Sequence, residues 1–237
     1  MTDSLRGREI ILAGGTGGLG AATAALLARE GATLILSYRA NHDRAERIAG
    51  NDRLLQADLG NEEERTALLD AASDLYGVVI LSGDPARGAN LSNTLRRSFE
   101  TNFEGPVLLA REAAERMKAA GTPGAIVLLG TMQSSGLFPG STAYAAQKAA
   151  LVYAARILAR ELRGPANIRV NVVNPGVTTA GMAQASVASG KYESFLQSGA
   201  IHRYGAADDI ARAIRFFLEP DNYITGQVLT VDGGLTL

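Results

Sequence analysis

Short apolar runs alternate with amphipathic stretches from one end of the chain to the other. The apolar runs are continuous in Val, Ile and Leu, which is typical of parallel strands covered on both faces of a sheet. The stretches between them have helical spacing. We expect strands at Glu9–Ala13, Thr33–Tyr38, Arg53–Gln56, Val78–Leu81, Ala125–Leu129, Arg169–Val173 and Val228–Val231. We expect helices near Gly18–Glu30, Asp43–Ala49, Glu62–Ser73, Ser92–Ala119, Ala143–Leu162 and Ala207–Leu218.

This alternation of strand and helix predicts right-handed βαβ units and a parallel sheet. No linker, repeat or low-complexity segment interrupts the pattern. We therefore expect an α/β fold, a single doubly wound Rossmann-type domain over residues 1–237 with helices flanking the sheet. In such a sheet, ligands bind beyond the carboxyl ends of the strands, so the residues that follow each strand are the ones to inspect.

Composition excludes several classes of function. The formal net charge is -1, which gives no electrostatic footprint for nucleic acid or an anionic membrane. Cysteine is absent, and the two histidines, His42 and His202, lie far apart, so the sequence predicts neither a disulfide nor a metal site. The start of the chain is polar, and no apolar run approaches the ~20 residues of a membrane span. We expect a cytoplasmic protein.

A glycine-rich turn joins the first strand to the first helix, with Gly14, Gly18 and Gly20 in a Gly-x-x-x-Gly-x-Gly spacing. A strand, a glycine turn and a helix together let backbone N–H groups approach a phosphate. We expect that side chains at Gly18 or Gly20 would keep a pyrophosphate away from the helix. The same pattern also occurs in ordinary turns, so nucleotide binding and a plain turn both remain open.

Polar residues follow the second and third strands. Arg39 comes after the second strand, where no acid is present to bind a ribose 2′-hydroxyl. Arg39 therefore either holds the 2′-phosphate of NADP or is an ordinary surface arginine. Asp58 follows the third strand, and it either accepts a hydrogen bond from an adenine amino group or caps the helix beginning near Asn61.

A proline interrupts the long helical stretch after the fourth strand. Because Pro106 has no N–H, the carbonyl of Asn102 loses its usual donor four residues on. A freed carbonyl at a cleft can hold a water molecule, whereas the alternative is a simple kink in a surface helix.

The fifth strand leads to Thr131, and Tyr144 and Lys148 follow at positions i and i+4 of one predicted helix. An ammonium group beside a phenol favours the phenolate, so we expect Lys148 to lower the pKa of Tyr144 from its ordinary value near ~10. A tyrosine with a lowered pKa can act as a general acid or base nearer neutrality. The alternative is a packed tyrosine beside a solvated lysine.

Together these motifs resemble those of the short-chain dehydrogenase/reductase family over essentially the whole chain. The C-terminal motifs are most similar to the subset that contains 3-oxoacyl-[acyl-carrier-protein] reductases and related carbonyl reductases. The matching pieces are Gly14…Gly18…Gly20, Asp58, Asn102, Tyr144…Lys148, Asn174-Pro175-Gly176, Thr225-Gly226-Gln227 and Val231-Asp232-Gly233-Gly234.

The resemblance implies a seven-stranded sheet and gives roles to particular residues. Tyr144 would move the proton at the substrate oxygen, and Lys148 would lower its pKa and bind the nicotinamide ribose. Asn102 would anchor a proton-relay water, and Thr131 would hold the substrate oxygen, with Ser134 or Ser135 as substitutes. The implied cofactor-binding residues are Gly14, Thr16, Gly17, Gly18, Leu19, Gly20, Tyr38, Arg39, Asp58, Leu59, Ser82, Gly83, Tyr144, Lys148, Pro175, Gly176, Val177, Thr178 and Thr179.

The resemblance further implies a substrate lid over about residues 180–199 and a homotetramer or dimer that pairs the long helices Ser92–Ala119 and Ala143–Leu162. Four positions depart from the family pattern: Ala13, the Ile80–Gly83 segment, Thr131, and the displaced threonine at Thr178 or Thr179. We expect an oxidoreductase that prefers NADP(H) to NAD(H) and transfers a hydride to or from a carbonyl or secondary alcohol, including a 3-oxoacyl thioester. The alternative is a dinucleotide-binding regulator or scaffold with weak turnover.

Overall fold

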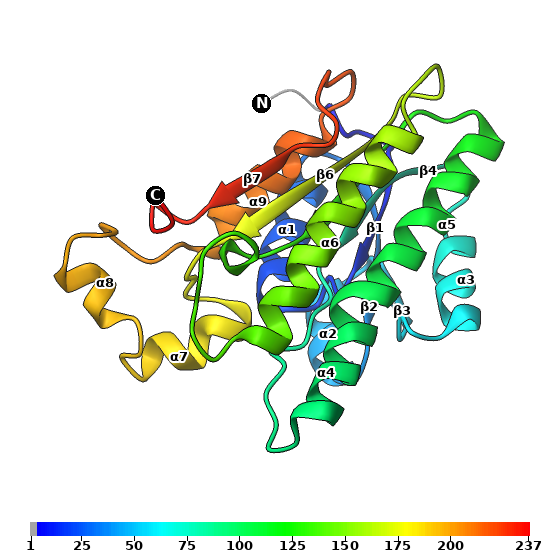
Figure 1. The fold of residues 1–237 in the computed structure, drawn as a ribbon. Helices are drawn as coiled ribbons and strands as arrows, with labels where there is room; N and C mark the ends of the chain where they lie inside the picture. The colour runs from blue at the N-terminus through cyan, green and yellow to red at the C-terminus, as the bar shows by residue number, and fades with distance from the viewer. Residues whose placement is uncertain (1–3) are drawn as a thin grey trace.

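The computed structural model describes residues 4–237 and contains one seven-stranded parallel sheet. The strand order is β3-β2-β1-β4-β5-β6-β7, so the order reverses between β1 and β4 (Figure 1). The doubly wound sheet expected from the sequence is confirmed. The strands are β1 (Glu9–Ala13), β2 (Thr33–Tyr38), β3 (Arg53–Gln56), β4 (Leu75–Ile80), β5 (Gly124–Leu129), β6 (Ile168–Pro175) and β7 (Val228–Val231).

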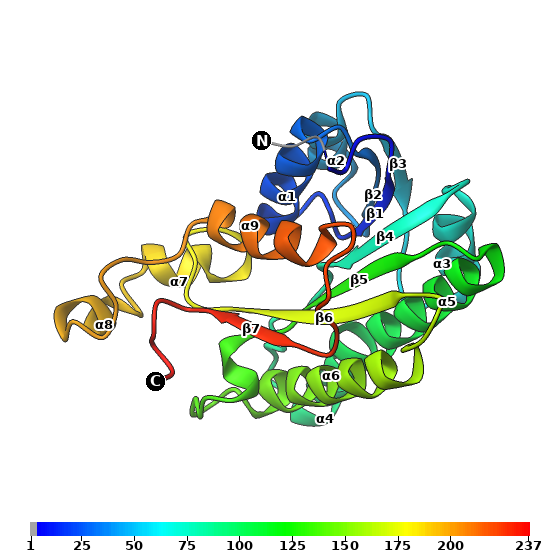
Figure 2. The same cartoon turned by 90° about the horizontal axis from the view of Figure 1, so that it is seen from above.

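Helices cover both faces of the sheet. Helices α1 (Gly18–Arg29), α2 (His42–Ala49) and α9 (Ala207–Leu218) lie on one face, and α3 (Glu62–Asp70), α5 (Gly105–Ala120) and α6 (Thr142–Glu161) lie on the other (Figure 2). Successive side chains of a strand point to opposite faces. Accordingly, Ile10 packs with α1 and α9, whereas its neighbour Ile11 packs with α3, α5 and α6. This double burial explains why the strands are continuous apolar runs.

The long helix expected over Ser92–Ala119 is interrupted. It consists of α4 (Leu91–Phe99), a π-helical turn at Glu100–Glu104 and α5. Gly105 N–H bonds to the carbonyl of Glu100, five residues back, and Pro106 follows at the start of α5. The missing proline N–H therefore coincides with a widened turn. The sequence alone had predicted either a simple kink or a freed carbonyl at this position.

The other differences between the predicted and the observed elements lie at the ends of strands and in short helices. β4 begins three residues before the expected Val78, at Leu75, and β6 continues to Pro175. Four short helices were not expected: 3-10 turns at Met132–Ser134 and Gly181–Ala183, and α-helices α7 (Gln184–Ala188) and α8 (Glu193–Gln197). Segments of three to five residues carry too little periodicity to be recognised in sequence.

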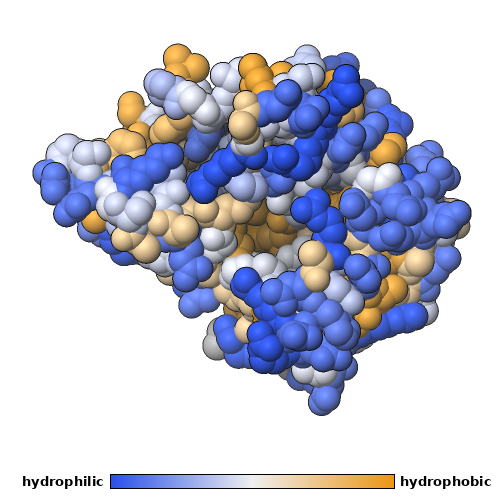
Figure 3. All heavy atoms as spheres, turned by 90° about the horizontal axis from the view of Figure 1, so that it is seen from below, coloured by the Kyte–Doolittle hydropathy of each residue, from blue (hydrophilic) through white to orange (hydrophobic). Residues whose placement is uncertain are grey.

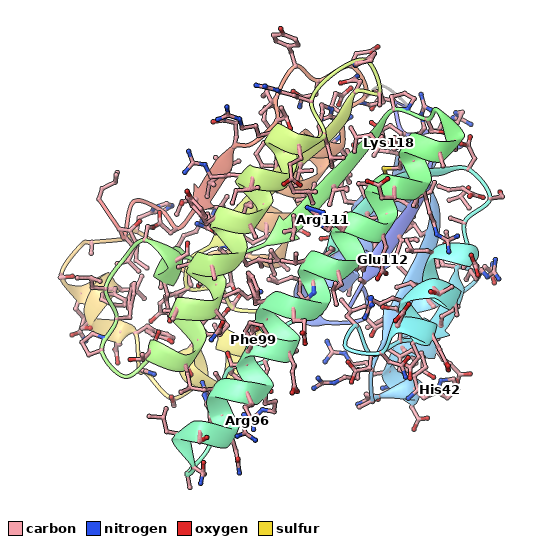
Figure 4. All side chains as sticks on the ribbon, turned by 45° about the vertical axis from the view of Figure 1, so that its right-hand side comes forward. His42, Arg96, Phe99, Arg111, Glu112 and Lys118 are labelled. Atoms are coloured by element: carbon pink, nitrogen blue, oxygen red, sulfur yellow. The ribbon has the colours of Figure 1, made fainter. Side chains whose placement is uncertain are left out.

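Helix α5 is tied to its neighbours on both sides. Arg111 and Glu112 lie on this helix, where Figure 4 labels them. Arg111 pairs with Glu161 of α6 at 2.6 Å, and Glu112 pairs with the buried Arg65 of α3 at 2.8 Å. Within residues 4–237, no helix is long and apolar enough to cross a membrane. The same residues contain no group of three His, Asp or Glu side chains that could hold a metal ion.

Candidate active site

The glycine turn after β1 needs its glycines because the protein's own backbone leaves no room for side chains there. Gly14 has φ +80°, and a Cβ on it would lie 3.1 Å from the backbone nitrogen of Ser82. A Cβ on Gly20 would lie 2.5 Å from the carbonyl oxygen of Gly15, and one on Gly18 would lie 2.5 Å from the nitrogen of Gly181. Any side chain at Gly18 or Gly20 would thus collide with backbone before it reached a ligand.

A cavity of about 370 Å³ opens over this turn at the carboxyl ends of β1, β2 and β4. The α1 N-terminus there has no side-chain cap, so its first N–H groups are available to an anion. Ser82 also lines the cavity, and its Oγ is the one buried side-chain polar atom without a partner among residues 4–237. An orphan hydroxyl, an uncapped helix and a glycine turn together fit a bound dinucleotide. Of the predicted cofactor residues, the cavity is lined by Gly14, Thr16, Gly17, Gly18, Leu19, Gly20, Tyr38, Arg39, Asp58, Leu59, Ser82 and Gly83.

Two cations lie at the far end of this cavity, where the second strand ends. Arg39 and Arg44 both line it and are exposed, and neither forms an ion pair within the described chain. The neighbouring Tyr38 ring packs against His42 with centroids 5.4 Å apart. Arg39 was expected from the sequence, whereas Arg44 was missed because it lies in the first turn of α2, six residues beyond the end of β2.

Asp58 does not cap the following helix. Asn61 does, because its side chain accepts hydrogen bonds from the N–H groups of Glu63 and Glu64. The Asp58 carboxylate instead accepts the N–H of Gly60 at 3.0 Å. The capping alternative for Asp58 is therefore wrong, and its contact with adenine stays a prediction.

A second cavity, of about 220 Å³, adjoins the first. Leu19, Leu129 and Met182 line both cavities and so mark the boundary between them. The face of the molecule seen in Figure 3 is hollowed near its centre, with apolar side chains on the floor and hydrophilic ones around the rim. Among the predicted residues, Leu19, Thr131, Tyr144, Pro175, Gly176, Val177 and Thr178 line the second cavity.

The hydroxyl groups of Tyr144 and Thr131 meet at this second cavity. Burial raises the pKa of Tyr144 to about 12, while a hydrogen bond with the Thr131 side chain acts in the opposite direction. Ser134 and Ser135 are not equivalent to Thr131 as donors to a substrate oxygen, because their hydroxyls already donate to the carbonyls of Thr131 and Met132. The expectation that the tyrosine pKa falls below its ordinary value is therefore wrong, because burial of the phenol outweighs the hydrogen bond with Thr131.

Lys148 is almost completely buried beneath the two cavities. Its Nζ donates to the carbonyl oxygen of Leu129 at 2.8 Å, and burial lowers the pKa of its ammonium group from 10.5 to about 7. Desolvation penalises the charged form of the ammonium group, which is why the pKa of Lys148 falls. The predicted fall in the tyrosine pKa is absent because burial of Tyr144 itself has the largest influence on that pKa.

Asn102 is fully buried behind the cofactor cavity. Its Oδ1 accepts the N–H of Asp84 at 2.9 Å, and its Nδ2 donates to the Asp84 carbonyl and to Ser98 Oγ. Ser98 in turn donates to the carbonyl of Ala143, next to Tyr144. The Asn102 side chain thus fixes the loop after β4 and connects it to the start of α6.

Asn174, at the end of β6, holds the loop that carries Thr131. Its Oδ1 accepts the backbone N–H of Thr131 at 3.0 Å, and its Nδ2 donates to Ser134 Oγ at 2.9 Å. A Cβ on Gly130 would lie 2.0 Å from the same Oδ1. In the sequence, Asn174 stands out only as part of the Asn174-Pro175-Gly176 motif, and no local pattern predicts its contact with Thr131.

The loop after β6 reaches both cavities. A Cβ on Gly176 would lie 2.5 Å from Asp232, and Thr178 Oγ1 donates to the carbonyl of Ala180 at 3.0 Å. Thr179 lines neither cavity; it is exposed, and its N–H and hydroxyl both bond to the carbonyl of Gly205. Gly181 and Met182, at the start of the expected lid, line the cofactor cavity. The sequence predicted this segment as a substrate lid and did not predict that it borders the cofactor.

The chain is similar to known proteins over almost its whole length. A family model described as enoyl-(acyl carrier protein) reductase matches residues 13–236. Carbonyl reductase family member 4 of Danio rerio is 34% identical over 246 residues, which cover 97% of this chain and 98% of that protein. An NADPH-dependent aldehyde reductase-like protein, chloroplastic, of Arabidopsis thaliana is 30% identical over 257 residues, with coverage of 97% and 94%. A short-chain type dehydrogenase/reductase from Mycobacterium ulcerans superposes with a TM-score of 0.89 at 28% identity, covering 98% of this chain and 91% of that one.

The fold and the site define a dinucleotide-dependent oxidoreductase. The chain belongs to the short-chain dehydrogenase/reductase family.

Proposed function

We propose that the protein is an NADP(H)-preferring oxidoreductase that interconverts a carbonyl and a secondary alcohol. The observation that carries this proposal is the position of Tyr144 and Thr131 in a cavity that shares Leu19, Leu129 and Met182 with the cofactor cavity. A carbonyl bound at the two hydroxyls would lie in the cavity that adjoins the cofactor cavity, and Leu19, Leu129 and Met182 would border both ligands. The 3-oxoacyl thioesters are one substrate class within this proposal.

The dinucleotide, when bound, supplies or accepts the hydride. Tyr144 donates the proton to the carbonyl oxygen, and because its pKa is about 12 the phenol is fully protonated at neutral pH. Thr131 donates a second hydrogen bond to the same oxygen and stabilises the negative charge that develops there. Lys148, with a pKa of about 7, exchanges protons readily at neutral pH and is buried close to Gly83 on the cofactor side.

The preference for NADP(H) rests on Arg39 and Arg44. Both guanidinium groups line the adenosine end of the cavity without an ion-pair partner in the described chain, so both can meet a 2′-phosphate. The segment Ser37-Tyr38-Arg39 contains no acid that would favour the unphosphorylated ribose. Glycine-turn N–H groups, Asp58, Ser82 and the Pro175–Thr178 loop would hold the remainder of the cofactor.

We also propose a homo-oligomer that pairs α6 and the long helical stretch from α4 to α5 with the same helices of a second copy. Phe99 on α4 (Figure 4) and Tyr153 and Ile157 on α6 are large apolar side chains exposed by 41%, 65% and 46%. Such side chains on adjacent helices form an apolar face suited to helix pairing. Size-exclusion chromatography with light scattering tests this, and a monomer would contradict it.

The experiment that tests the activity is NADPH oxidation, followed optically, with a panel of ketones, quinones and 3-oxoacyl thioesters. We expect turnover of at least one class, and a lower rate with NADH in place of NADPH. The alternative, a dinucleotide-binding regulator, is suggested by the Ile80–Gly83 segment, which departs from the family pattern where it borders the cofactor cavity. Tight NADPH binding without any turnover would support that alternative.

A further inference from the structure

The second cavity has an unusual charge distribution at its mouth. Arg87, on the loop after β4, and Lys191, after α7, both line it, and none of its other lining residues is an acid. The whole chain nevertheless has slightly more acidic than basic residues, 24 against 23. Neither cation forms an ion pair within the part of the chain that the structure describes. Two exposed cations over a cavity without carboxylates form a local positive field.

The loop after β4 is built so that Arg87 keeps its charge available. The nearest acid in sequence, Asp84, is already paired with Arg97 at 3.0 Å. Arg97 also donates to the carbonyl of Arg87 at 2.7 Å and so fixes its backbone. Ala86 has φ +53°, an unfavourable conformation for a non-glycine residue, and its N–H bonds to Asp84 Oδ1 at 2.7 Å. This ordered turn directs the chain so that Arg87 borders the cavity.

The Arg87 side chain also connects the two walls of the mouth. Its Nη2 donates to Ser186 Oγ at 3.2 Å, and Ser186 is a buried residue of α7. On the opposite wall, Lys191 Nζ lies 5.5 Å from the centre of the Tyr192 ring, and Tyr192 itself lines the cavity. The following acid, Glu193, lines neither cavity and does not pair with Lys191. Both cations are therefore held near the mouth by contacts that leave their charges unneutralised.

We propose that the substrate carries an anionic group, a carboxylate or a phosphate, which Arg87 and Lys191 bind while its carbonyl reaches Tyr144 and Thr131. This inference rests on the proposed carbonyl reductase activity and specifies the class of substrate. An anion remote from the carbonyl would be held by charge-assisted hydrogen bonds at the mouth, and the apolar lining would accommodate the carbon chain between the two ends.

The test uses the enzyme with NADPH and two matched substrate pairs. Levulinate is compared with methyl levulinate, and acetoacetyl-coenzyme A with the acetoacetyl thioester of N-acetylcysteamine. We expect the anionic member of at least one pair to have the higher kcat/KM. Preference within the first pair assigns a carboxylate, and preference within the second pair alone assigns the phosphates of the carrier.

Arg87→Gln and Lys191→Gln should each raise KM for the anionic substrate about ten-fold or more, as expected for loss of a charged hydrogen bond. The neutral member of the pair should change by less than about two-fold in both variants. Arg29→Gln is the matched control, because Arg29 is an exposed cation at the end of α1 that lines neither cavity. Equal effects of the Arg87 and Lys191 variants on both members of each pair would overturn the proposal while leaving the carbonyl reductase activity in place.

Calorimetry separates this inference from catalysis. We expect Tyr144→Phe protein loaded with NADPH to bind levulinate or acetoacetyl-coenzyme A, and to lose this affinity when Arg87→Gln and Lys191→Gln are added. Unchanged affinity in the triple variant, or the same affinity for the neutral analogue, contradicts the anion site whether or not turnover is observed.

Discussion

Asn174 accepts the backbone N–H of Thr131 at 3.0 Å across 43 residues of sequence. The bond joins the end of β6 to the loop after β5, and Nδ2 of the same amide holds Ser134. Thr131 and Tyr144 interact through their side chains on the cavity side of this loop. The position of the proposed substrate-binding hydroxyl therefore depends on an amide that itself does not line the cavity.

Asn174→Ala should lower kcat about ten- to a hundred-fold with little change in NADPH affinity, because the Thr131 hydroxyl loses its fixed position. Asn174 acts as a positioning residue, so its effect should shrink in a Thr131→Val background, and a double-mutant cycle measures this coupling. Ser134→Ala is the control: it removes the Nδ2 contact and the hydrogen bond from Ser134 to the Thr131 carbonyl, but it leaves Oδ1 bonded to the Thr131 N–H, so it should have a smaller effect. Full additivity of the Asn174 and Thr131 substitutions would indicate a general structural role instead.

Substitutions at Thr131 should separate the hydroxyl from the methyl group. Thr131→Ser keeps the donor and should retain most of kcat, whereas the nearly isosteric Thr131→Val should lose about 10²–10³-fold, the usual effect of removing one preorganised donor. Because the hydrogen bond from Thr131 lowers the pKa of Tyr144, the Val variant should also shift the alcohol-oxidation pH profile to higher pH. Near-normal turnover of Thr131→Val would move the role to another donor.

Lys148 should make stability depend on pH in a predictable direction. The pKa of Lys148 is about 7 in the folded protein, whereas the ordinary value of 10.5 applies to the unfolded chain. At pH values between these two pKa values, the unfolded state therefore binds one more proton than the folded state. The free energy of unfolding should therefore rise with pH in this window, by up to about 1.4 kcal/mol per pH unit from this group, and stay level below the window. Lys148→Met should lack this slope when urea denaturation is followed between about pH 7.5 and 9.5. If the free energy of unfolding rises equally with pH in Lys148→Met and in the unmodified protein, the pKa of Lys148 is not lowered.

Arg39→Ala should weaken NADPH binding about ten-fold or more, as expected when a charge-assisted contact to phosphate is lost. NADH binding should barely change, because it has no 2′-phosphate. Arg44→Ala is expected to act in the same direction, and fluorescence titration of both dinucleotides gives the comparison. If both dinucleotides weaken equally, or the unmodified protein prefers NADH, the assignment of the 2′-phosphate site is wrong.

The sequence predicted those features that depend on local pattern. Buried strands, the helix carrying Tyr144 and Lys148, and the glycine turn all follow from periodicity and spacing within a few residues. The direction of the two pKa shifts did not follow, because it depends on how deeply the packed sheet buries Tyr144 and Lys148. The Asn174–Thr131 bond and the Arg87–Ser186 bond also escaped prediction, since each joins segments that only tertiary structure brings together.

Replacement of Tyr144 by Phe tests whether this phenol is the general acid of the reaction. This change removes one hydroxyl and leaves the rest of the cavity intact, so general acid catalysis should be lost while the cofactor cavity is undisturbed. We predict a fall in kcat of about 10²–10⁴-fold with an NADPH dissociation constant within a few-fold of the unmodified protein. Substantial activity of Tyr144→Phe, with a carbonyl substrate that is not reduced by NADPH in buffer alone, would show that Tyr144 is not the proton donor.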